Sequence, residues 1–232
     1  MTKFLFVFTS ANKTLTGHQT GWFLPEVTKP GSPAAHPYYR LAPHIDIDFA
    51  APKGPNPEVD QNSVKSFTDD ESVKFLNDPV VKSKLSSAKK LSEVNVDDYV
   101  GIFYIGGHGP VIDLPTDPEN IKLANKFWSH NKIVSAVCHG PAALVNVTDP
   151  SGKSIFAGRK ATAFSNAEEE KIDMVSAIPF LVENRIVELG GHYEKATELW
   201  EPKVIVDGKL ITGQNPASAA PIGETILKAL KA

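Results

Sequence analysis

Short runs of apolar residues recur along the chain, and their β-branched and aromatic composition is typical of buried strands. The first run covers residues 3–9 and ends before Ser10. Residues 203–212 are predicted to form a hairpin, because the pair Asp207-Gly208 favours the tight turn between antiparallel strands. Further runs of the same kind predict strands over residues 45–49, 100–105, 132–137 and 160–164.

Between these runs, apolar residues recur every three or four positions, as they do in amphipathic helices. Residues 71–91 should form two helices divided at Pro79, and the helical region 168–189 should be interrupted at Pro179. Residues 51–68 contain several prolines and a glycine, which predicts a long loop. The other expected helices cover residues 120–130 and 217–231, with one or two turns within 22–29 and a helix starting at 142–145.

The alternation of strands with helices predicts an α/β fold, in which a mostly parallel sheet carries helices on both faces. Functional sites in such sheets lie at the carboxyl ends of the strands. Two unusual turns, at residues 106–109 and 138–141, directly follow predicted strands. We therefore expect the site at this edge of the sheet.

A length of 232 residues suits one large domain or a domain with an appended piece.

Composition and charge exclude several classes of protein and partner. Hydrophobic residues make up 41% and charged residues 22% of the chain, which is usual for a globular protein and unlike a disordered or coiled-coil chain. Because 24 basic residues face 27 acidic ones, the net charge is −3. We expect neither nucleic acid nor an anionic membrane as a partner, since both bind basic surfaces.

The cysteine content and the length of the apolar runs bear on location. One cysteine cannot form an intrachain disulfide, so a reducing compartment is expected. The apolar run at residues 4–8 is far shorter than the roughly 20 residues of a membrane span or the roughly 7 to 15 of a signal sequence core. We therefore expect no targeting segment and a cytoplasmic protein, with residence in the nucleus left open.

The single cysteine, Cys138, stands at the end of a predicted strand and is followed by His139, Gly140 and Pro141. Proline suits the first turn of a helix, so a strained strand-to-helix turn would present the sulfur at a helix N-terminus. There the helix dipole and backbone N–H groups can lower a thiol pKa from about 8.5 to roughly 3.5 to 7.5. A buried structural cysteine is the alternative. The adjacent His139 supplies a candidate base and favours a nucleophile.

The turn Gly106-Gly107-His108-Gly109 lacks the Lys-Ser/Thr pair of a phosphate loop and the glycine spacing of a dinucleotide site, so nucleotide binding is not expected. Glycines at a strand end let backbone N–H groups approach a developing negative oxygen. The candidate donors are the N–H groups of Gly107 and His139. A plain tight turn is the alternative. His108 could bind substrate, but a histidine satisfied within the turn is favoured.

Two positions carry carboxylates that are candidates for the site, Glu26 and the run at residues 168–170. Glu26 lies in the apolar stretch 22–27, where an inward-facing carboxylate would be desolvated, have a raised pKa and exchange protons. A solvent-facing glutamate on a short helix is favoured by this pattern alone. Glu168, Glu169 and Glu170 begin a predicted helix, where acidic residues are expected from the helix dipole.

The histidines show no metal-ligand spacing and a lone cysteine excludes a cysteine-rich zinc site, so we expect no metal.

Several of these segments together resemble the ThiJ/PfpI superfamily, and the likeness covers nearly the whole chain. Within the superfamily the chain is similar to the fungal, heat-shock chaperone-like branch of glutathione-independent glyoxalases III. The matching segments are Ala136-Val137-Cys138-His139-Gly140-Pro141, Gly106-Gly107-His108-Gly109, Thr20-Gly21 with Glu26, and Thr212-Gly213-Gln214-Asn215-Pro216-Ala217-Ser218.

This resemblance implies a flavodoxin-like fold, also described as class I glutamine amidotransferase-like, with a small cap. Residues 1–232 would then form a single domain of the ThiJ/PfpI type with cap or loop insertions around 51–95. The resemblance also implies a homodimer that converts methylglyoxal, a small 2-oxoaldehyde, to D-lactate without a cofactor.

The resemblance also assigns roles to individual residues. Cys138 matches the nucleophile, His139 its histidine partner, and Glu26 the carboxylate that hydrogen-bonds the sulfur and relays protons. The third member of the triad is an acid shortly after Asn166. Alignment favours Glu169 over Glu168, and the register between them stays open.

Other functions are compatible with the same residues. A holding chaperone would bind unfolded-protein clients through an exposed apolar surface, and its activity should survive Cys138→Ala. A redox sensor would use a low-pKa Cys138 thiol, which oxidises readily. Repair of glycated proteins, a deglycase activity, is a further alternative for the same cysteine.

Overall fold

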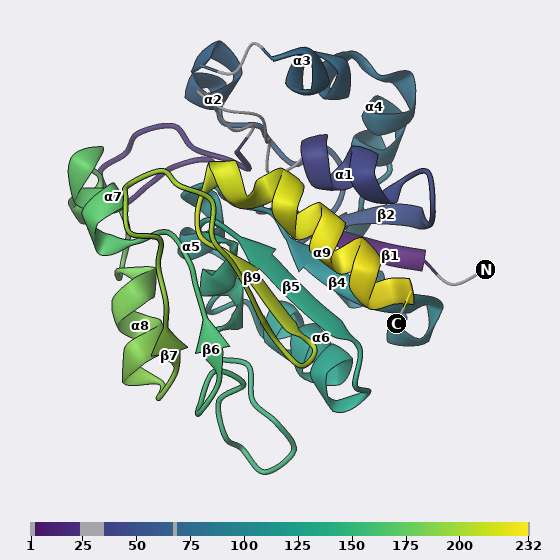
Figure 1. Cartoon of the computed structure of the whole chain (residues 1–232). Helices are drawn as coiled ribbons and strands as arrows, with labels where there is room; N and C mark the ends of the chain where they lie inside the picture. Colours follow the sequence, from purple (N-terminus) through teal and green to yellow (C-terminus); the bar gives the residue numbers. More distant parts are fainter. Residues whose placement is uncertain (1–2, 24–34, 67–68, 232) are drawn as a thin grey trace.

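A seven-stranded sheet forms the centre of the molecule (Figure 1). The structure is a computed structural model and describes residues 3–23, 35–66 and 69–231. The strands lie side by side in the order β3 (Lys89–Lys90), β2 (Asp46–Ala51), β1 (Lys3–Val7), β4 (Tyr99–Tyr104), β5 (Ile133–Val137), β9 (Leu210–Gly213) and β8 (Val204–Asp207).

All neighbouring strands in this sheet run parallel except β8 and β9, which form the predicted antiparallel hairpin. Residues of β1 are buried on both faces. Phe4 and Phe6 belong to one hydrophobic core, and Leu5 and Val7 belong to the other. This burial explains why the run is apolar throughout rather than alternating, as is usual for parallel strands covered on both sides.

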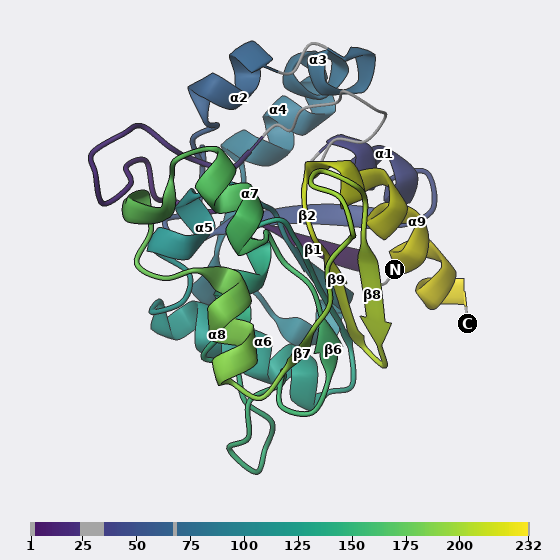
Figure 2. The same ribbon diagram turned by 60° about the vertical axis from the view of Figure 1, so that its left-hand side comes forward.

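Helices cover both faces of the sheet, which confirms the predicted fold class (Figures 1 and 2). Apolar residues of one group of helices join the core that contains Phe4, and those of a second group join the core that contains Leu5. The first group is α1 (Ala35–Leu41), α3 (Asp70–Asn77), α4 (Pro79–Ser86) and α9 (Ala219–Lys231). The second is α5 (Gly109–Ile112), α6 (Pro118–Ser129) and α8 (Val182–Glu188).

The predicted division of a long helical region at Pro79 is confirmed, because α4 begins at that residue. Asp78 caps α4 by accepting a hydrogen bond from the backbone N–H of Val80 at 2.8 Å. The region predicted at 168–189 is likewise split, into α7 (Asn166–Lys171) and α8. The part of the helical segment predicted at 22–29 beyond residue 23 lies outside the described residues.

The prediction of a continuous loop over residues 51–68 was wrong, because α2 (Gln61–Ser66) lies within it. The Asp60 side chain accepts hydrogen bonds from the backbone N–H groups of Asn62 at 2.8 Å and Ser63 at 3.1 Å. An aspartate in this position satisfies the first donors of a helix, so a helix forms here despite the prolines that precede it.

Two further elements are shorter than predicted. The strand expected at 160–164 is only β6 (Lys160–Ala161), which pairs with β7 (His192–Tyr193) in a separate two-stranded sheet. The chain leaves the ladder after Ala161 because the N–H of Phe164 donates to the carbonyl of Cys138 at 2.9 Å. The helix expected from residues 142–145 is a short 3-10 helix, Gly140–Leu144.

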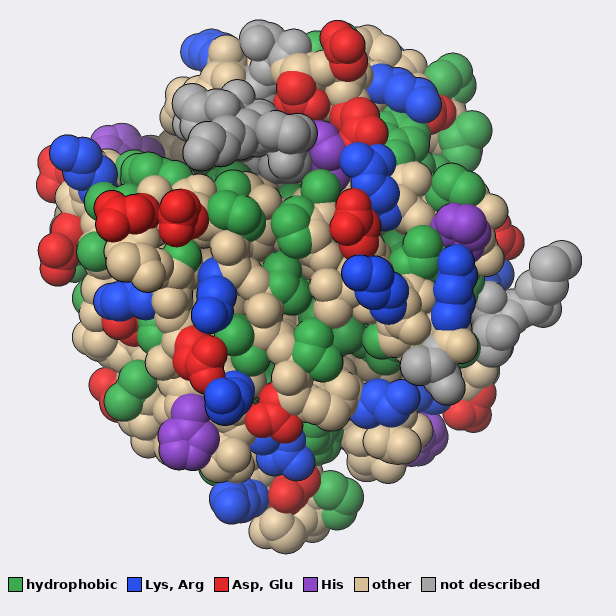
Figure 3. Space-filling model, in the orientation of Figure 1, with side chains coloured by type: hydrophobic (Ala, Val, Ile, Leu, Met, Phe, Trp, Pro, Cys, Tyr) green, Lys and Arg blue, Asp and Glu red, His purple; other side chains and the backbone are tan. Residues whose placement is uncertain are grey.

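The lengths of the described helices bear on whether one could span a membrane, and the distribution of charge is visible on one face of the molecule. In the described ranges, every helix is too short or too polar to cross a bilayer. On the face shown in Figure 3, lysine and arginine side chains are interspersed with aspartate and glutamate.

Candidate active site

Cys138 sits at the carboxyl end of β5 in a left-handed backbone conformation, with φ of 61°. This conformation costs roughly 1 to 2 kcal/mol in a residue with a Cβ, so surrounding contacts must hold it. The Cys138 N–H donates to the carbonyl of Gly213 at 2.9 Å, and the Cys138 carbonyl accepts from the N–H of Phe164 at 2.9 Å. The predicted strained turn is therefore confirmed.

A glycine on the neighbouring strand end makes room for this turn. A Cβ added at Gly106 would lie only 2.6 Å from the Cβ of Cys138 and 3.3 Å from its sulfur. The next residue, Gly107, has φ of 107°, which residues with side chains rarely adopt. Gly106 is thus required by the close approach of the end of β4 to Cys138, whereas Gly107 is required by its positive φ and by the closeness of Gly21 and Phe23.

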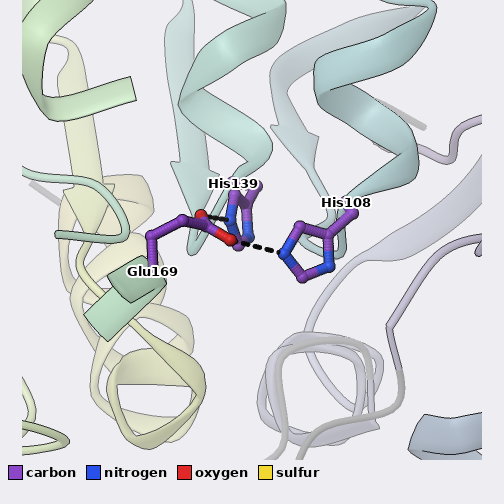
Figure 4. Close-up of side chains that lie close together, drawn as sticks. All are labelled: His108, His139 and Glu169. Carbon is purple, nitrogen blue, oxygen red and sulfur yellow. Dashed lines mark hydrogen bonds and ion pairs between the residues drawn. The ribbon is translucent and has the colours of Figure 1, made fainter. Parts of the chain in front are cut away.

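A chain of hydrogen-bonding side chains leads away from the sulfur. Cys138 Sγ lies 3.3 Å from Nδ1 of His139, and Nε2 of His139 lies 2.5 Å from Oε2 of Glu169. The other carboxylate oxygen, Oε1, lies 2.8 Å from Nε2 of His108 (Figure 4). The structure therefore brings together residues from the ends of β4 and β5 and from α7, and Glu169 bridges two imidazole rings.

The ionisation of Glu169 fixes the protons on both rings. Burial opposes its ionisation, but the contacts with His139 and His108 hold its pKa well below the usual range. A carboxylate only accepts hydrogen bonds, so each histidine must carry a proton on Nε2. Burial lowers the pKa of His139, which keeps that ring neutral. Its Nδ1 then presents a lone pair to the cysteine.

The expectation of a low thiol pKa was wrong in the resting protein. Burial raises the pKa of Cys138 above its ordinary value, and the carboxylates of Glu168 and Glu169 add to this rise. Backbone hydrogen bonds from Gly107 and His139 act in the opposite direction but do not overcome burial. The helix that follows is a short 3-10 helix, whose dipole is small.

The two proposed oxyanion donors converge on one point, because the backbone N–H groups of Gly107 and His139 both hydrogen-bond to the Cys138 sulfur. The donors therefore surround the atom at which a carbonyl carbon would react. His108, for which a purely local role was favoured, instead reaches across the site to Glu169.

The same cluster could hold a metal ion. Ligand atoms of His108, His139 and Glu169 all lie within 4.8 Å of one another, and the three residues are buried. Two imidazoles and a carboxylate are a familiar ligand set for zinc and for other divalent transition metals. The fold creates this grouping from three distant segments, which is why spacing along the sequence did not indicate it.

Residues 44–229 match the DJ-1/PfpI family. This chain belongs to the DJ-1/PfpI family. The resemblance inferred from the cysteine and glycine turns is confirmed.

The family members most similar in sequence include fungal glyoxalases. Glyoxalase 3 of Candida albicans is 30% identical over 244 residues, which cover 100% of this chain and 99% of that protein. A glutathione-independent glyoxalase of Saccharomyces cerevisiae is 30% identical over 239 residues, covering 99% of this chain and 98% of that protein.

Two solved structures share the whole fold. The Rapid Encystment Protein 24 kDa of Francisella tularensis superposes with a TM-score of 0.90 at 34% identity, covering 99% of each chain. Glyoxalase III from Candida albicans superposes with a TM-score of 0.86 at 28% identity, covering 98% of this chain and 97% of that one.

Within this family fold, the two neighbouring glutamates that sequence left unresolved point to different places. Glu169 contacts His139 and His108, whereas the Glu168 side chain accepts hydrogen bonds from Ser165 at the start of α7. Glu26, the carboxylate expected at the sulfur, lies outside the described residues.

One aromatic contact at the site was not predicted from the sequence. The ring of Phe164 stacks on the His139 ring, with centroids 4.4 Å apart. The only available signal was its place two residues before the acidic helix start. A single apolar residue in a predicted strand carries no indication that it faces a site, so the fold was needed to find it.

Proposed function

We propose that this protein is a glutathione-independent glyoxalase III, a lyase of the hydro-lyase type that converts methylglyoxal to D-lactate. The hydrogen-bonded series Cys138, His139 and Glu169 is the observation that carries the proposal. The names of its relatives in Candida albicans and Saccharomyces cerevisiae support the substrate class.

In the proposed first step, the Cys138 sulfur attacks the aldehyde carbon of methylglyoxal. A C–S bond forms, the carbonyl electron pair moves to oxygen, and the thiol proton passes to Nδ1 of His139. The neutral ring and the 3.3 Å contact suit this transfer. The N–H groups of Gly107 and His139 are the proposed donors to the oxyanion, which becomes a hemithioacetal hydroxyl once protonated.

In the second step, a proton moves between the two carbons of the substrate. Glu26 or His139 removes the hydrogen of the former aldehyde carbon as a proton, which gives an enediol-like intermediate, and a proton is returned to the neighbouring carbon. The product of this step is a lactate thioester on Cys138. Because the oxidation of one carbon is balanced by reduction of the other, no external hydride acceptor is consumed.

In the last step, water attacks the thioester carbon, the C–S bond breaks, and the sulfur recovers its proton. The sum is methylglyoxal plus one water giving lactate. Cys138 supplies the thiol that glutathione would otherwise provide, so the reaction should run without that co-substrate.

The test is consumption of methylglyoxal with detection of D-lactate by purified protein in the absence of glutathione. Cys138→Ala should abolish turnover, and Glu169→Gln should lower kcat by about a hundredfold or more, because the amide no longer fixes the proton on His139. Glu26→Gln tests the proton relay and should also lose turnover.

Glu170→Gln provides the matched control, since it makes the same chemical change at an exposed position of α7. Turnover by the Cys138→Ala variant would overturn the mechanism. An inactive wild type whose Cys138 is shown to be reduced would overturn the proposed function itself.

A further inference from the structure

A stack of aromatic rings leads from the reactive histidine to the protein surface. The Phe164 ring lies against His139 at 4.4 Å and is almost fully buried. The Trp200 ring lies against the other end of this stack, 5.8 Å from Phe164 between centroids, and is 39% exposed. Pairwise ring contacts therefore connect the buried His139 through Phe164 to the partly exposed Trp200.

Trp200 is held in its place against a conformational preference. Its φ is 66°, a left-handed value that a bulky residue rarely adopts, and such residues persist only where the surroundings fix them. Its backbone N–H donates to Oε1 of Glu168 at 3.1 Å. Strain of this kind is concentrated at functional sites.

Glu168 is the centre of the anchor that holds this segment. The residue is fully buried, and backbone and side-chain donors from several segments converge on its carboxylate. Oε1 accepts from Trp200 N–H and Asn215 Nδ2, and Oε2 accepts from Ser165 N–H, Ser165 Oγ and Gln214 Nε2.

The segment Gln214-Asn215-Pro216-Ala217-Ser218 supplies the rest of the anchor. It holds residues 196–203, which run past α7 between β7 and β8 (Figure 1). The Gln214 side chain accepts from Ala196 N–H at 2.8 Å, Asn215 donates to the carbonyl of Glu201 at 2.8 Å, and the Ser218 hydroxyl accepts from Lys203 N–H at 3.0 Å. These contacts bracket Trp200 on both sides.

We propose that Phe164 and Trp200 form the apolar wall that receives the substituent of the substrate, so that the site takes 2-oxoaldehydes bearing apolar or aryl groups. Glu168 is the positioning residue that sets Trp200 against Phe164. The choice of substrate rests on the proposed function, whereas the wall itself does not. The two adjacent glutamates thus have separate roles. Glu169 orients His108 and His139, whereas Glu168 positions Trp200.

The first experiment measures kcat and KM for phenylglyoxal and for glyoxal, which has no substituent. Trp200→Ala should lower kcat/KM for phenylglyoxal about tenfold, mainly through KM, because lost apolar contact weakens binding of the ring. For glyoxal the change should stay within about twofold. Trp128→Phe, a change on α6, is the control and should leave the ratio unchanged.

A second measurement does not depend on turnover. Cys138 is the only cysteine, so its alkylation can be followed by intact mass. 2-Bromoacetophenone and bromoacetone react with a thiol in the same way and differ only in a phenyl or methyl group. Trp200→Ala should lower the ratio of their rates about tenfold in favour of the methyl compound.

Glu168→Gln should shift both ratios in the same direction, because the amide nitrogen replaces one acceptor by a donor and releases Trp200. Glu170→Gln, the same change at an exposed position, should shift neither. Combining Glu168→Gln with Trp200→Ala should add nothing beyond Trp200→Ala alone. If Glu168→Gln does not fold, the two ratios measured for Trp200→Ala alone test the apolar wall.

The outcomes separate the two proposals. Ratios within twofold of the wild type in a folded Trp200→Ala variant, or a rise in preference for the phenyl reagent, would overturn the apolar wall. Loss of aryl preference in alkylation together with absent lactate production would support the wall and overturn the glyoxalase assignment.

Discussion

At the scale of single residues, the surroundings of Cys138 favour a protonated thiol next to a proton acceptor. Burial holds the proton on the Cys138 thiol, while the neutral Nδ1 of His139 lies 3.3 Å away to receive it. The low pKa of Glu169 keeps that ring in the tautomer required. A raised thiol pKa disfavours the redox-sensor alternative, because the thiolate is the form that oxidises readily.

This arrangement predicts the pH dependence of thiol reactivity. Because burial raises the pKa of Cys138 above its ordinary value, the thiolate fraction should still be rising at pH 9. The rate of iodoacetamide alkylation should therefore increase from pH 7 to pH 10 without reaching a plateau. Stopped-flow or intact-mass kinetics would measure it, and a plateau below pH 8 would contradict the assigned direction.

At the scale of elements, an ionic cluster fastens the edge of the sheet opposite β8. Asp48 on β2 contacts Lys89 of β3 at 2.9 Å, Tyr99 of β4 at 2.8 Å and Lys3 of β1 at 3.2 Å. Burial opposes ionisation of Asp48, but these hydrogen bonds lower its pKa to about 2. One carboxylate therefore links four strands.

Asp48→Asn should lower the free energy of unfolding at pH 7 by about 1 to 3 kcal/mol, because charge-assisted hydrogen bonds are lost. The folded-state pKa lies below the ordinary value of 3.8, so the contribution is fully present above that value and is lost as pH falls through about 2. Urea denaturation should show the difference from wild type shrinking between pH 4 and pH 2.

Asp46→Asn is the matched control, since Asp46 lies on the same strand and is exposed. An equal loss of stability in both variants would show that the cluster contributes nothing specific to this edge.

At the scale of the whole molecule, the sheet gathers residues that are far apart in the sequence. The ends of β4 and β5 bring His108 beside His139, and α7 brings Glu169 to both. The resemblance to the superfamily leads us to expect a homodimer, the commonest symmetric assembly. Sedimentation equilibrium should give about 50 kDa, twice the 25.1 kDa of the chain, and a monomer at micromolar concentration would refute it.

The sequence indicated the sheet and the turn at Cys138 well, because both depend on local signals. Apolar runs marked β1 and β5, and Cys138 and His139 stood out as neighbours between a strand and a proline. The direction of the thiol pKa could not be read in this way, since it depends on burial by distant segments. The choice between Glu168 and Glu169 also needed the fold, because both occupy the first turn of α7.

The backbone contacts of Cys138 determine when, during synthesis and folding, the surroundings of its thiol can form. Its left-handed turn depends on the carbonyl of Gly213, in a strand that the ribosome makes much later. A nascent chain that has reached the cysteine still lacks the partner that holds it. The thiol should therefore remain an ordinary one throughout synthesis, and its folded surroundings should form only when β9 docks beside β5.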